Sequence, residues 1–359
     1  MSTAAAAAPA AAGLAGAGQT RPRVLFVGLG GGSCSGKTTL AKHLLRILRS
    51  AGDTKSFILH QDDFAPKEED LPLAWNGDQQ VRDWDTPHGS IDFGKMHRVL
   101  QHIRTHASTP PEFSSHDKLN VLPDVSIPDD LISRWADRLR QAINHKRAGT
   151  TSADNRDDQQ HFVVVLVDGF LAYFDPRVRS ELDLRFFTRC SRDVMKSRRA
   201  QRSYITAEEN LWQDPPGYYD NIVWPAYVLA HQGMFEHGDV ERGALRPPLT
   251  PSSAQNDRST RVPNGSASQQ EEEEEKDPTY KAAVAKEGPA GGPVRGLVIL
   301  DERQEEDGSR KLPAAAGENE DKETAVPMAE MVERACGEIV KTLEAEAEAE
   351  ADASSGSRR

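Results

Sequence analysis

The sequence has little of what marks disulfide-rich, metal-centred, membrane-spanning or nucleic-acid-binding proteins. Its 359 residues include three cysteines, which are scattered along the chain as Cys34, Cys190 and Cys336. Their spacing argues against a disulfide framework and a cysteine metal site, and their small number favours a reducing compartment. No apolar run approaches the roughly 20 residues that span a bilayer. Lys and Arg number 44 against 56 Asp and Glu, and this balance gives no support to nucleic acid as a partner.

Four segments contain too few apolar residues to form a core. They are dominated by Ala and Gly, by Pro, Ser and Gln, or by charged residues, and in chain order they are residues 1–22, 249–293, 302–325 and 346–359. Such stretches bury too little apolar surface to offset the chain entropy lost on folding. We therefore predict that the first three are disordered and that the fourth is an acidic, polar tail. One globular domain is expected at 23–248, completed by a last strand and a C-terminal helix within 294–345.

One glycine-rich motif follows directly on an apolar run. The motif, G-G-S-C-S-G-K-T-T at Gly31–Thr39, comes after Val24–Val27, and apolar residues at helical spacing continue from Leu40 to Leu48. This fits G-x-x-x-x-G-K-[ST] between a strand and a helix, where backbone N–H groups and the helix N-terminus hold a phosphate. In that pattern Lys37 reaches the β- and γ-phosphates, and Thr38 places its hydroxyl on a magnesium ion. The motif predicts a nucleoside-triphosphate site.

Strand-like runs alternate with helical segments along the rest of the domain. They are residues 24–27, 56–60, 162–167, 184–187 and 297–300. This alternation predicts an α/β fold with a five-stranded parallel sheet, in which ligands bind beyond the carboxyl ends of the strands. Asp62 and Asp168 follow two of these runs. A carboxylate there can accept a proton from an attacking hydroxyl or coordinate magnesium, so we assign Asp62 as the base and Asp168 as the metal-side group. A single Asp at such a position can also be a helix cap.

A basic segment at 192–202 has the pattern of a helix. Arg198 and Arg202 share one face of this helix, and Arg199 points to another. Such a helix could close over the site, contact the triphosphate and the acceptor with different faces, and neutralise the charge that develops during phosphoryl transfer. The alternative is a solvated helix face.

Two aromatic segments are candidates for the acceptor side. Trp84 lies in a polar stretch and is followed by Asp85. We interpret them as an aromatic face for a flat ring and an acceptor for vicinal sugar hydroxyls, with a small local core as the alternative for Trp84. The second segment, Asp214–Asp220, reads D-P-P-G-Y-Y-D. It predicts a rigid loop packed by its own aromatic side chains.

Taken together, the motifs resemble those of nicotinamide riboside kinases, particularly the fungal ones. The resemblance rests on the phosphate loop and on Q-D-D-F, W-D-T-P, V-D-G-F, K-S-R-R-A-Q-R and D-P-P-G-Y-Y-D, which begin at residues 61, 84, 167, 196 and 214. It implies a P-loop kinase fold with an Arg-bearing lid helix. It also implies transfer of a phosphoryl group from ATP, with Mg²⁺, to the 5′-hydroxyl of nicotinamide riboside or nicotinic acid riboside, a step of NAD salvage.

The resemblance also implies a role for each matching residue. The catalytic residues would be Asp62, Lys37 and Arg198. ATP would be bound by Gly31, Ser33, Cys34, Ser35, Gly36, Lys37, Thr38, Thr39, Arg198, Arg202 and Tyr204. The acceptor would be bound by Asp62, Asp63, Phe64, Trp84, Asp85, Arg199 and Tyr204, and the metal by Thr38, Asp62 and Asp168.

Two other functions share part of this pattern. Uridine and cytidine kinases also have a phosphate loop, an Asp after the second strand and a D-x-P element like Asp85–Pro87. A non-kinase P-loop NTPase that acts through partners shares only the loop; the sequence has no N-K-x-D guanine-reading element and carries its own Arg segment. We expect a cytoplasmic enzyme, with the nucleus as an alternative, that acts on a small-molecule nucleoside as a monomer or homodimer, without nucleic acid or membrane.

Overall fold

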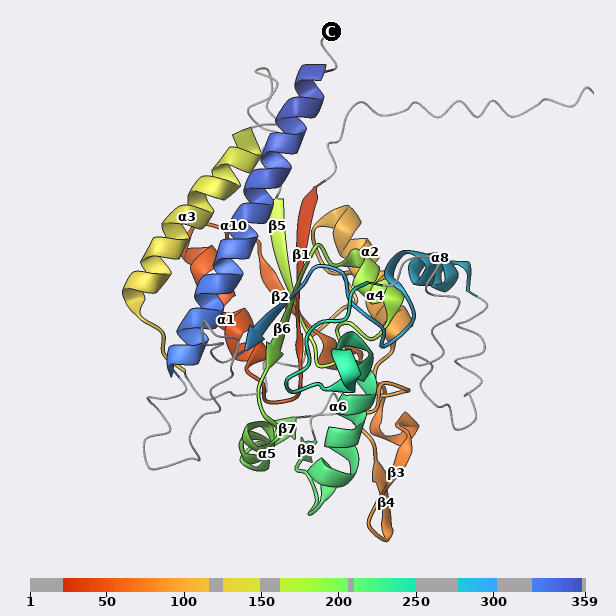
Figure 1. The fold of residues 1–359 in the computed structure, drawn as a ribbon. Helices are drawn as coiled ribbons and strands as arrows, with labels where there is room; N and C mark the ends of the chain where they lie inside the picture. The colour runs from red at the N-terminus through yellow and green to blue at the C-terminus, as the bar shows by residue number, and fades with distance from the viewer. Residues whose placement is uncertain are drawn as a thin grey trace, which may run out of the picture.

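A five-stranded parallel sheet forms the centre of the molecule (Figure 1). The computed structural model describes residues 22–115, 125–148, 162–205, 210–248, 277–301 and 325–356. The sheet has the order β2-β5-β1-β6-β9, with β1 at Arg23–Gly31, β2 at Phe57–His60, β5 at Phe162–Asp168, β6 at Leu184–Arg189 and β9 at Leu297–Asp301. All neighbouring pairs are parallel. The predicted α/β class, the five runs and their parallel arrangement are therefore confirmed.

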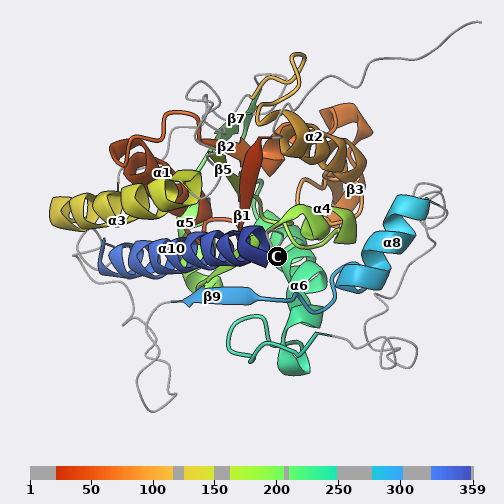
Figure 2. The same cartoon turned by 90° about the horizontal axis from the view of Figure 1, so that it is seen from above.

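The two faces of the sheet are covered by different helices (Figures 1 and 2). On one face lie α1 (Lys37–Ser50), α3 (Asp129–Ala148) and α10 (Ala325–Gly356); on the other lie α2 (Phe93–His106), α4 (Pro176–Glu181), α6 (Trp224–His231) and α8 (Pro278–Glu287). None of the described helices has the length and apolar character needed to cross a membrane.

The side chains of the central strand β1 point alternately into two separate hydrophobic cores. Val27 and Leu29 of β1 belong to the core shared with α1, α3 and α10, whereas Phe26 belongs to the core on the α2 and α4 side. Side chains of a strand point alternately to opposite faces, so a strand between two helical layers must be apolar at nearly every position. The unbroken run of β5, which is buried throughout, satisfies this constraint.

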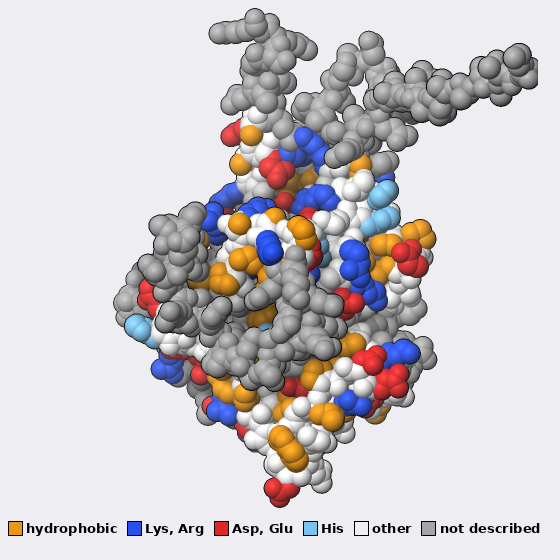
Figure 3. Space-filling view, turned by 90° about the vertical axis from the view of Figure 1, so that its right-hand side faces the viewer, with side chains coloured by type: hydrophobic (Ala, Val, Ile, Leu, Met, Phe, Trp, Pro, Cys, Tyr) orange, Lys and Arg blue, Asp and Glu red, His pale blue; other side chains and the backbone are white. Residues whose placement is uncertain are grey.

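Small elements gather at the carboxyl ends of the strands, in the lower part of Figure 1. They include α5 (Arg192–Ala200) and the hairpins β3–β4 (Leu73–Asn76 and Gln79–Arg82) and β7–β8 (Tyr204–Ile205 and Leu211–Trp212). The β3–β4 hairpin projects from the body and exposes Leu73 and Trp75; hydrophobic side chains also reach the surface at the lower end of Figure 3. Lys, Arg, Asp and Glu are interspersed on that face.

The predicted disorder at 249–293 is wrong for its last part. Residues 278–287 form α8, and the turn that follows is held by Arg179 of α4, whose side chain is 0 % exposed. Its guanidinium donates to the carbonyls of Gly288 (2.8 Å) and Pro289 (2.7 Å) and makes longer bonds to the next loop carbonyls. A tertiary partner therefore orders a segment whose composition alone has no core-forming pattern. The other predictions of disorder, at 1–22, 249–276 and 302–325, lie outside the described residues apart from residues 22 and 325.

The C-terminal helix also extends beyond its predicted end at residue 345. It continues as α10 to Gly356, and Ala347 is buried. Lys146 of α3 forms an ion pair with Glu346 at 2.7 Å. The start of the predicted tail therefore packs against α3, because small Ala side chains allow the two helices to approach.

Replacing Arg179 with Met should lower the free energy of unfolding by about 3 kcal/mol, because several buried carbonyls would lose a charged donor. Urea unfolding followed by circular dichroism measures this change. The matched control is Lys281→Met on the exposed side of α8, which should change stability by about 0.5 kcal/mol or less. Equal stability of the Arg179 variant and the wild type would mean that this contact does not anchor α8.

Candidate active site

The phosphate loop connects β1 to α1 and has a backbone that the sequence explains. Gly31 has a φ of +135°, and a Cβ there would lie 2.2 Å from the carbonyl oxygen of Thr188. Only glycine fits this approach of β1 to β6. Ser35 fixes the loop from inside through a 2.5 Å hydrogen bond between its hydroxyl and that of Thr188. The Lys37 ammonium donates to the carbonyl of Gly32 at 2.8 Å, so it lies within the curve of the loop.

The charges of two carboxylates favour the ammonium form of the buried Lys37. Burial lowers the pKa of Lys37, and the charges of Asp168 and Asp62 act in the opposite direction without cancelling the effect. Asp168 ends β5 in register with His60 at the end of β2. The expected convergence of strand ends on the phosphate loop is thus present in the fold.

Asp168 is the most constrained of these acids. Its carboxylate is 6 % exposed and lies 3.3 Å from Nδ1 of His60. Burial would raise the pKa of Asp168, but the hydrogen bond from His60, the charge of Lys37 and the nearby Thr38 hydroxyl hold it below its usual value. The group therefore stays ionised at neutral pH.

The turn after β2 separates the side chains of the Q-D-D-F motif. In this 3₁₀ turn, η1 (Gln61–Phe64), Asp62 is exposed, whereas Asp63 is buried. The fully buried Gln61 accepts a 2.7 Å hydrogen bond from the backbone of Leu171, which fixes the turn against the end of β5. Phe64 is 1 % exposed and packs on Phe113 with ring centroids 5.5 Å apart. The ring therefore belongs to the hydrophobic core, and the role of Phe64 in binding the acceptor stays a prediction.

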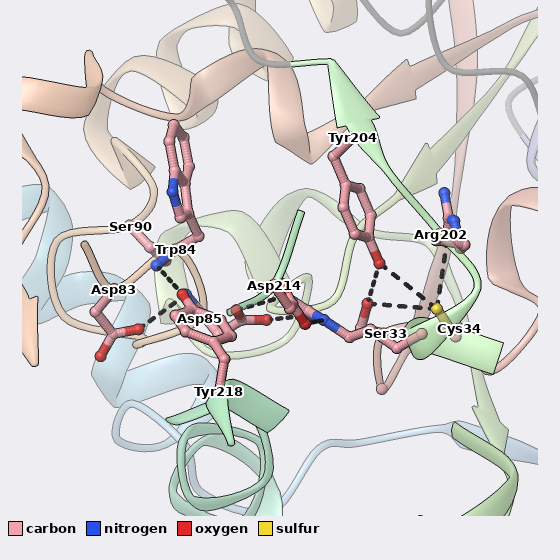
Figure 4. Close-up of polar contacts among 12 residues, drawn as sticks. Ser33, Cys34, Asp83, Trp84, Asp85, Ser90, Arg202, Tyr204, Asp214 and Tyr218 are labelled. Atoms are coloured by element: carbon pink, nitrogen blue, oxygen red, sulfur yellow. Dashed lines mark hydrogen bonds and ion pairs between the residues drawn. The ribbon is translucent and has the colours of Figure 1, made fainter. Parts of the chain in front are cut away.

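The lid segment, which we define as α5 and the turn that leads to Tyr204 (residues 192–204), contacts the phosphate loop at Cys34. Arg198 donates to the Cys34 carbonyl at 3.4 Å, and Arg202 lies 3.6 Å from the sulfur. The Tyr204 hydroxyl lies 3.3 Å from that of Ser33 and 3.6 Å from the Cys34 sulfur (Figure 4). Burial would raise the pKa of Cys34, but the charge of Arg202 and the Tyr204 hydroxyl lower it. Two arginine side chains therefore lie against the phosphate loop.

The predicted placement of Arg202 on the helix face is wrong, although its predicted neighbourhood holds. Helix α5 ends at Ala200, and Arg202 follows in the turn that leads to β7. The backbone N–H of Arg202 bonds to the carbonyl of Arg199 at 3.0 Å, so this turn sets its direction. Arg202 thereby reaches the same loop residue as Arg198 without sharing its helical face.

Arg199 points to the other side of the lid, where it meets Asp85. Its Nη1 and Nη2 donate to the two Asp85 oxygens at 2.7 and 2.9 Å, and both side chains are almost completely buried. Trp84 is partly exposed, and its indole packs on that of Trp212 with centroids 5.8 Å apart. The structure thus brings Trp84, Asp85 and Arg199 together, as predicted, and also gives Trp84 a local aromatic neighbour.

Sequence reasoning did not assign Asp214 or Trp212 to the site. Asp214 accepts from Nε of Arg199 at 2.6 Å and from Nε1 of Trp212 at 3.0 Å. Tyr218 is fully buried, which agrees with the predicted aromatic packing of this loop. The only sequence signal for Asp214 was its place at the start of the D-P-P-G-Y-Y-D motif, and proximity to Arg199 is a property of the fold.

Within the described residues no cluster of three or more His, Cys, Asp or Glu side chains could hold a metal ion by itself. Oδ1 of Asp168 is among the buried carboxylate oxygens that have no hydrogen-bond partner there. Mg²⁺ in phosphate-binding sites keeps waters and phosphate oxygens and takes only one or two protein ligands. The hydroxyl of Thr38 and the carboxylate of Asp168 therefore fit such an ion, together with Asp62.

Comparisons with known proteins agree with this geometry. A family model described as the Phosphoribulokinase / Uridine kinase family matches residues 26–206. The nicotinamide riboside kinase of Schizosaccharomyces pombe is 32% identical over 238 residues, which cover 66% of this chain and 92% of the relative. That of Eremothecium gossypii is 31% identical over 223 residues, covering 62% and 82%. The chain belongs to the phosphoribulokinase and uridine kinase family and, within it, to the group of the fungal nicotinamide riboside kinases.

Proposed function

We propose that this kinase transfers the γ-phosphoryl group of ATP to the 5′-hydroxyl of nicotinamide riboside and so forms the mononucleotide for NAD salvage. One observation carries the proposal: Arg199 pairs with Asp85 beside Trp84, while Arg198 and Arg202 contact the phosphate loop. The lid therefore joins a donor site to a site with the groups that a ribose and a flat ring require. The names of the similar fungal proteins support this acceptor.

The donor half consists of the phosphate loop and the lid. Backbone N–H groups of the loop Gly31–Thr39 would surround the β- and γ-phosphates, as in other P-loops. Lys37 would exchange its bond to the Gly32 carbonyl for phosphate oxygens. Arg198, Arg202 and Tyr204 would cover the triphosphate from the lid. Because the two arginines carry fixed positive charge, they would stabilise the charge that develops on the transferred group.

Magnesium would complete this half of the site. When bound, it would supply positive charge that stabilises the negative charge of the phosphates. We propose that Thr38, Asp62 and Asp168 hold it from the protein side, directly or through water. The hydrogen bond from His60 keeps Asp168 oriented, and the lowered pKa of Asp168 keeps its carboxylate available as a ligand at neutral pH.

We assign Asp62 as the general base. It is exposed in the turn after β2, and its charge acts on Lys37 to raise the pKa of that ammonium, while its neighbours Gln61 and Asp63 are buried. An exposed carboxylate in this position can accept the proton of the 5′-hydroxyl as that oxygen attacks the γ-phosphorus. The positive charges of Lys37 and of the lid arginines would stabilise the negative charge on the phosphoryl group during this attack.

On the acceptor side, Trp84 would stack on the pyridine ring, and Asp85 with Arg199 would bind the ribose hydroxyls. Asp85 accepts and Arg199 donates hydrogen bonds, so a vicinal diol can be satisfied by both. Tyr204 would lie between the two ligands, since its ring is 5.3 Å from the Arg199 guanidinium and its hydroxyl reaches Ser33. Asp63, which is buried in the turn that carries Asp62, stays among the residues proposed to bind the acceptor.

Steady-state kinetics across nicotinamide riboside, nicotinic acid riboside, uridine and cytidine test the proposed acceptor. We expect kcat/KM for nicotinamide riboside to exceed that for uridine or cytidine. More efficient phosphorylation of either pyrimidine nucleoside would replace the proposal with a uridine kinase activity. ATP turnover that does not depend on any nucleoside would indicate a P-loop NTPase that acts through partners.

Replacing Asp62 with Asn should lower kcat by about a hundredfold to ten-thousandfold, the range expected for loss of a general base. Affinity for ATP should stay close to that of the wild type, as measured by calorimetric titration. Asp70→Asn, at an exposed carboxylate in the 3₁₀ turn η2 (Glu68–Asp70) nearby, is the control and should keep full activity. Normal turnover by the Asp62 variant would refute its assignment as the base.

Replacing Trp84 with Ala should raise KM for the riboside by roughly tenfold, because a stacking surface is lost. The KM for ATP should not change. Trp75→Ala on the β3–β4 hairpin is the matched control, since that indole is 64 % exposed. An unchanged KM for the riboside would mean that Trp84 only packs in the local aromatic core and does not bind the acceptor.

A further inference from the structure

Arg199 is held by two carboxylates that come from distant parts of the chain. Asp85 takes both terminal nitrogens, and Asp214 accepts from Nε at 2.6 Å and from Nη2 at 3.2 Å. Burial would lower the pKa of Arg199, but the charge of Asp85 and the charge and hydrogen bond of Asp214 raise it well above its usual value. The guanidinium is thus permanently charged, and its planar fork is fixed along two edges.

Asp214 is itself oriented by the aromatic side of the site. The Trp212 indole donates to Oδ1 of Asp214 at 3.0 Å. The same indole contacts the ring of Trp84 and, at 5.6 Å between centroids, the ring of Tyr218. Tyr218 in turn accepts from the backbone N–H of Trp84 at 3.0 Å (Figure 4). Trp84, which we propose to stack on the acceptor ring, is therefore connected through Trp212 to Asp214, the carboxylate that binds Arg199.

A ribose would have to share Asp85 and Arg199 with the ion pair between them. Each oxygen of Asp85 accepts one bond from the guanidinium, so a sugar hydroxyl can use a remaining lone pair of Asp85 or the second N–H of Nη1. The contacts of Asp214 to Nε and Nη2 do not involve Nη1. They can hold the guanidinium in place while Nη1 donates to a hydroxyl.

We propose that Asp214, oriented by Trp212, is a positioning residue that makes the site selective for a ribose with both vicinal hydroxyls. The inference rests on the proposed nucleoside kinase function and deepens it. Asp214 acts through Arg199 and does not touch the acceptor. Without its carboxylate, Arg199 loses its second anchor as the sugar binds, and the hydroxyl contacts contribute less to affinity.

The test compares Asp214→Asn with the wild type on nicotinamide riboside and on its 2′-deoxy and 3′-deoxy analogues. The wild type should prefer the riboside, and the variant should lose about tenfold or more of this preference in kcat/KM, because a charged hydrogen bond is weakened. The loss should appear in KM for the riboside, with the KM for ATP unchanged. Trp212→Phe, which keeps a ring but removes the N–H donor, should shift the preference in the same direction.

A structural role alone would give a different pattern. Equal losses of kcat/KM on the riboside and on the deoxy analogues would overturn the proposal, as would an unchanged preference in both variants. If Asp214→Asn does not fold, Trp212→Phe decides by the same comparison. Asp220→Asn is the matched control, because this carboxylate pairs with Arg192 and Lys196 instead, and its preference should equal that of the wild type.

The same experiment distinguishes a failure of the proposed acceptor from a failure of the proposed role of Asp214. If the wild type phosphorylates uridine rather than nicotinamide riboside, the proposed acceptor is wrong, and the comparison is made with uridine and its deoxy forms. Every ribonucleoside presents the same vicinal diol, so a reduced preference in Asp214→Asn supports the positioning role in that case too. An unchanged preference refutes it with either acceptor.

Discussion

The buried ion pair between Arg199 and Asp85 is the interaction on which the arrangement of the site depends. It ties the lid after β6 to the loop before α2. Asp85 and Asp214 together accept hydrogen bonds from all three nitrogens of the guanidinium. A buried pair offsets its desolvation only when its geometry is good and its remaining donors are satisfied, and removal of one partner typically costs about 3–5 kcal/mol. With Arg199 fixed, the same short segment must direct Arg198 and Arg202 to the phosphate loop. One ion pair therefore helps to place the proposed acceptor site relative to the proposed donor site.

The parallel sheet supplies the other half of this geometry. Carboxyl ends of parallel strands lie along one edge, so Asp168 and the turn with Asp62 come next to the loop that holds Lys37. Lys37 is buried among the charges it needs: burial disfavours its ammonium form, and Asp168 and Asp62 favour it. A bound triphosphate would add negative charge and stabilise the ammonium further. The charges around Lys37 therefore suit a bound anion.

The sequence predicted the sheet because unbroken apolar runs have few alternatives in an α/β protein, and it predicted the phosphate loop because the motif depends on local backbone geometry. Features set by tertiary contacts were harder. The periodicity of the Arg segment could not show that α5 ends before Arg202, and Q-D-D-F does not reveal that Phe64 turns into the core. Residues 278–287 lie in a stretch whose composition suggested disorder, but Arg179 binds the carbonyls of Gly288 and Pro289 directly after α8. Asp214 and Trp212 were missed because their significance depends on their position next to Arg199. Arg199 precedes Asp214 by 15 residues, and the sequence does not show that the two side chains meet.

A crystal structure of the chain with a non-hydrolysable ATP analogue and nicotinamide riboside would test the central claim most directly. The account predicts the phosphates within the loop at Gly31–Thr39, the ribose hydroxyls within hydrogen-bond distance of Asp85 and Arg199, and the 5′-oxygen next to Asp62. The pyridine ring should lie against Trp84. A riboside bound elsewhere, with the bidentate pair of Arg199 and Asp85 unchanged and no contact to the sugar, would contradict it.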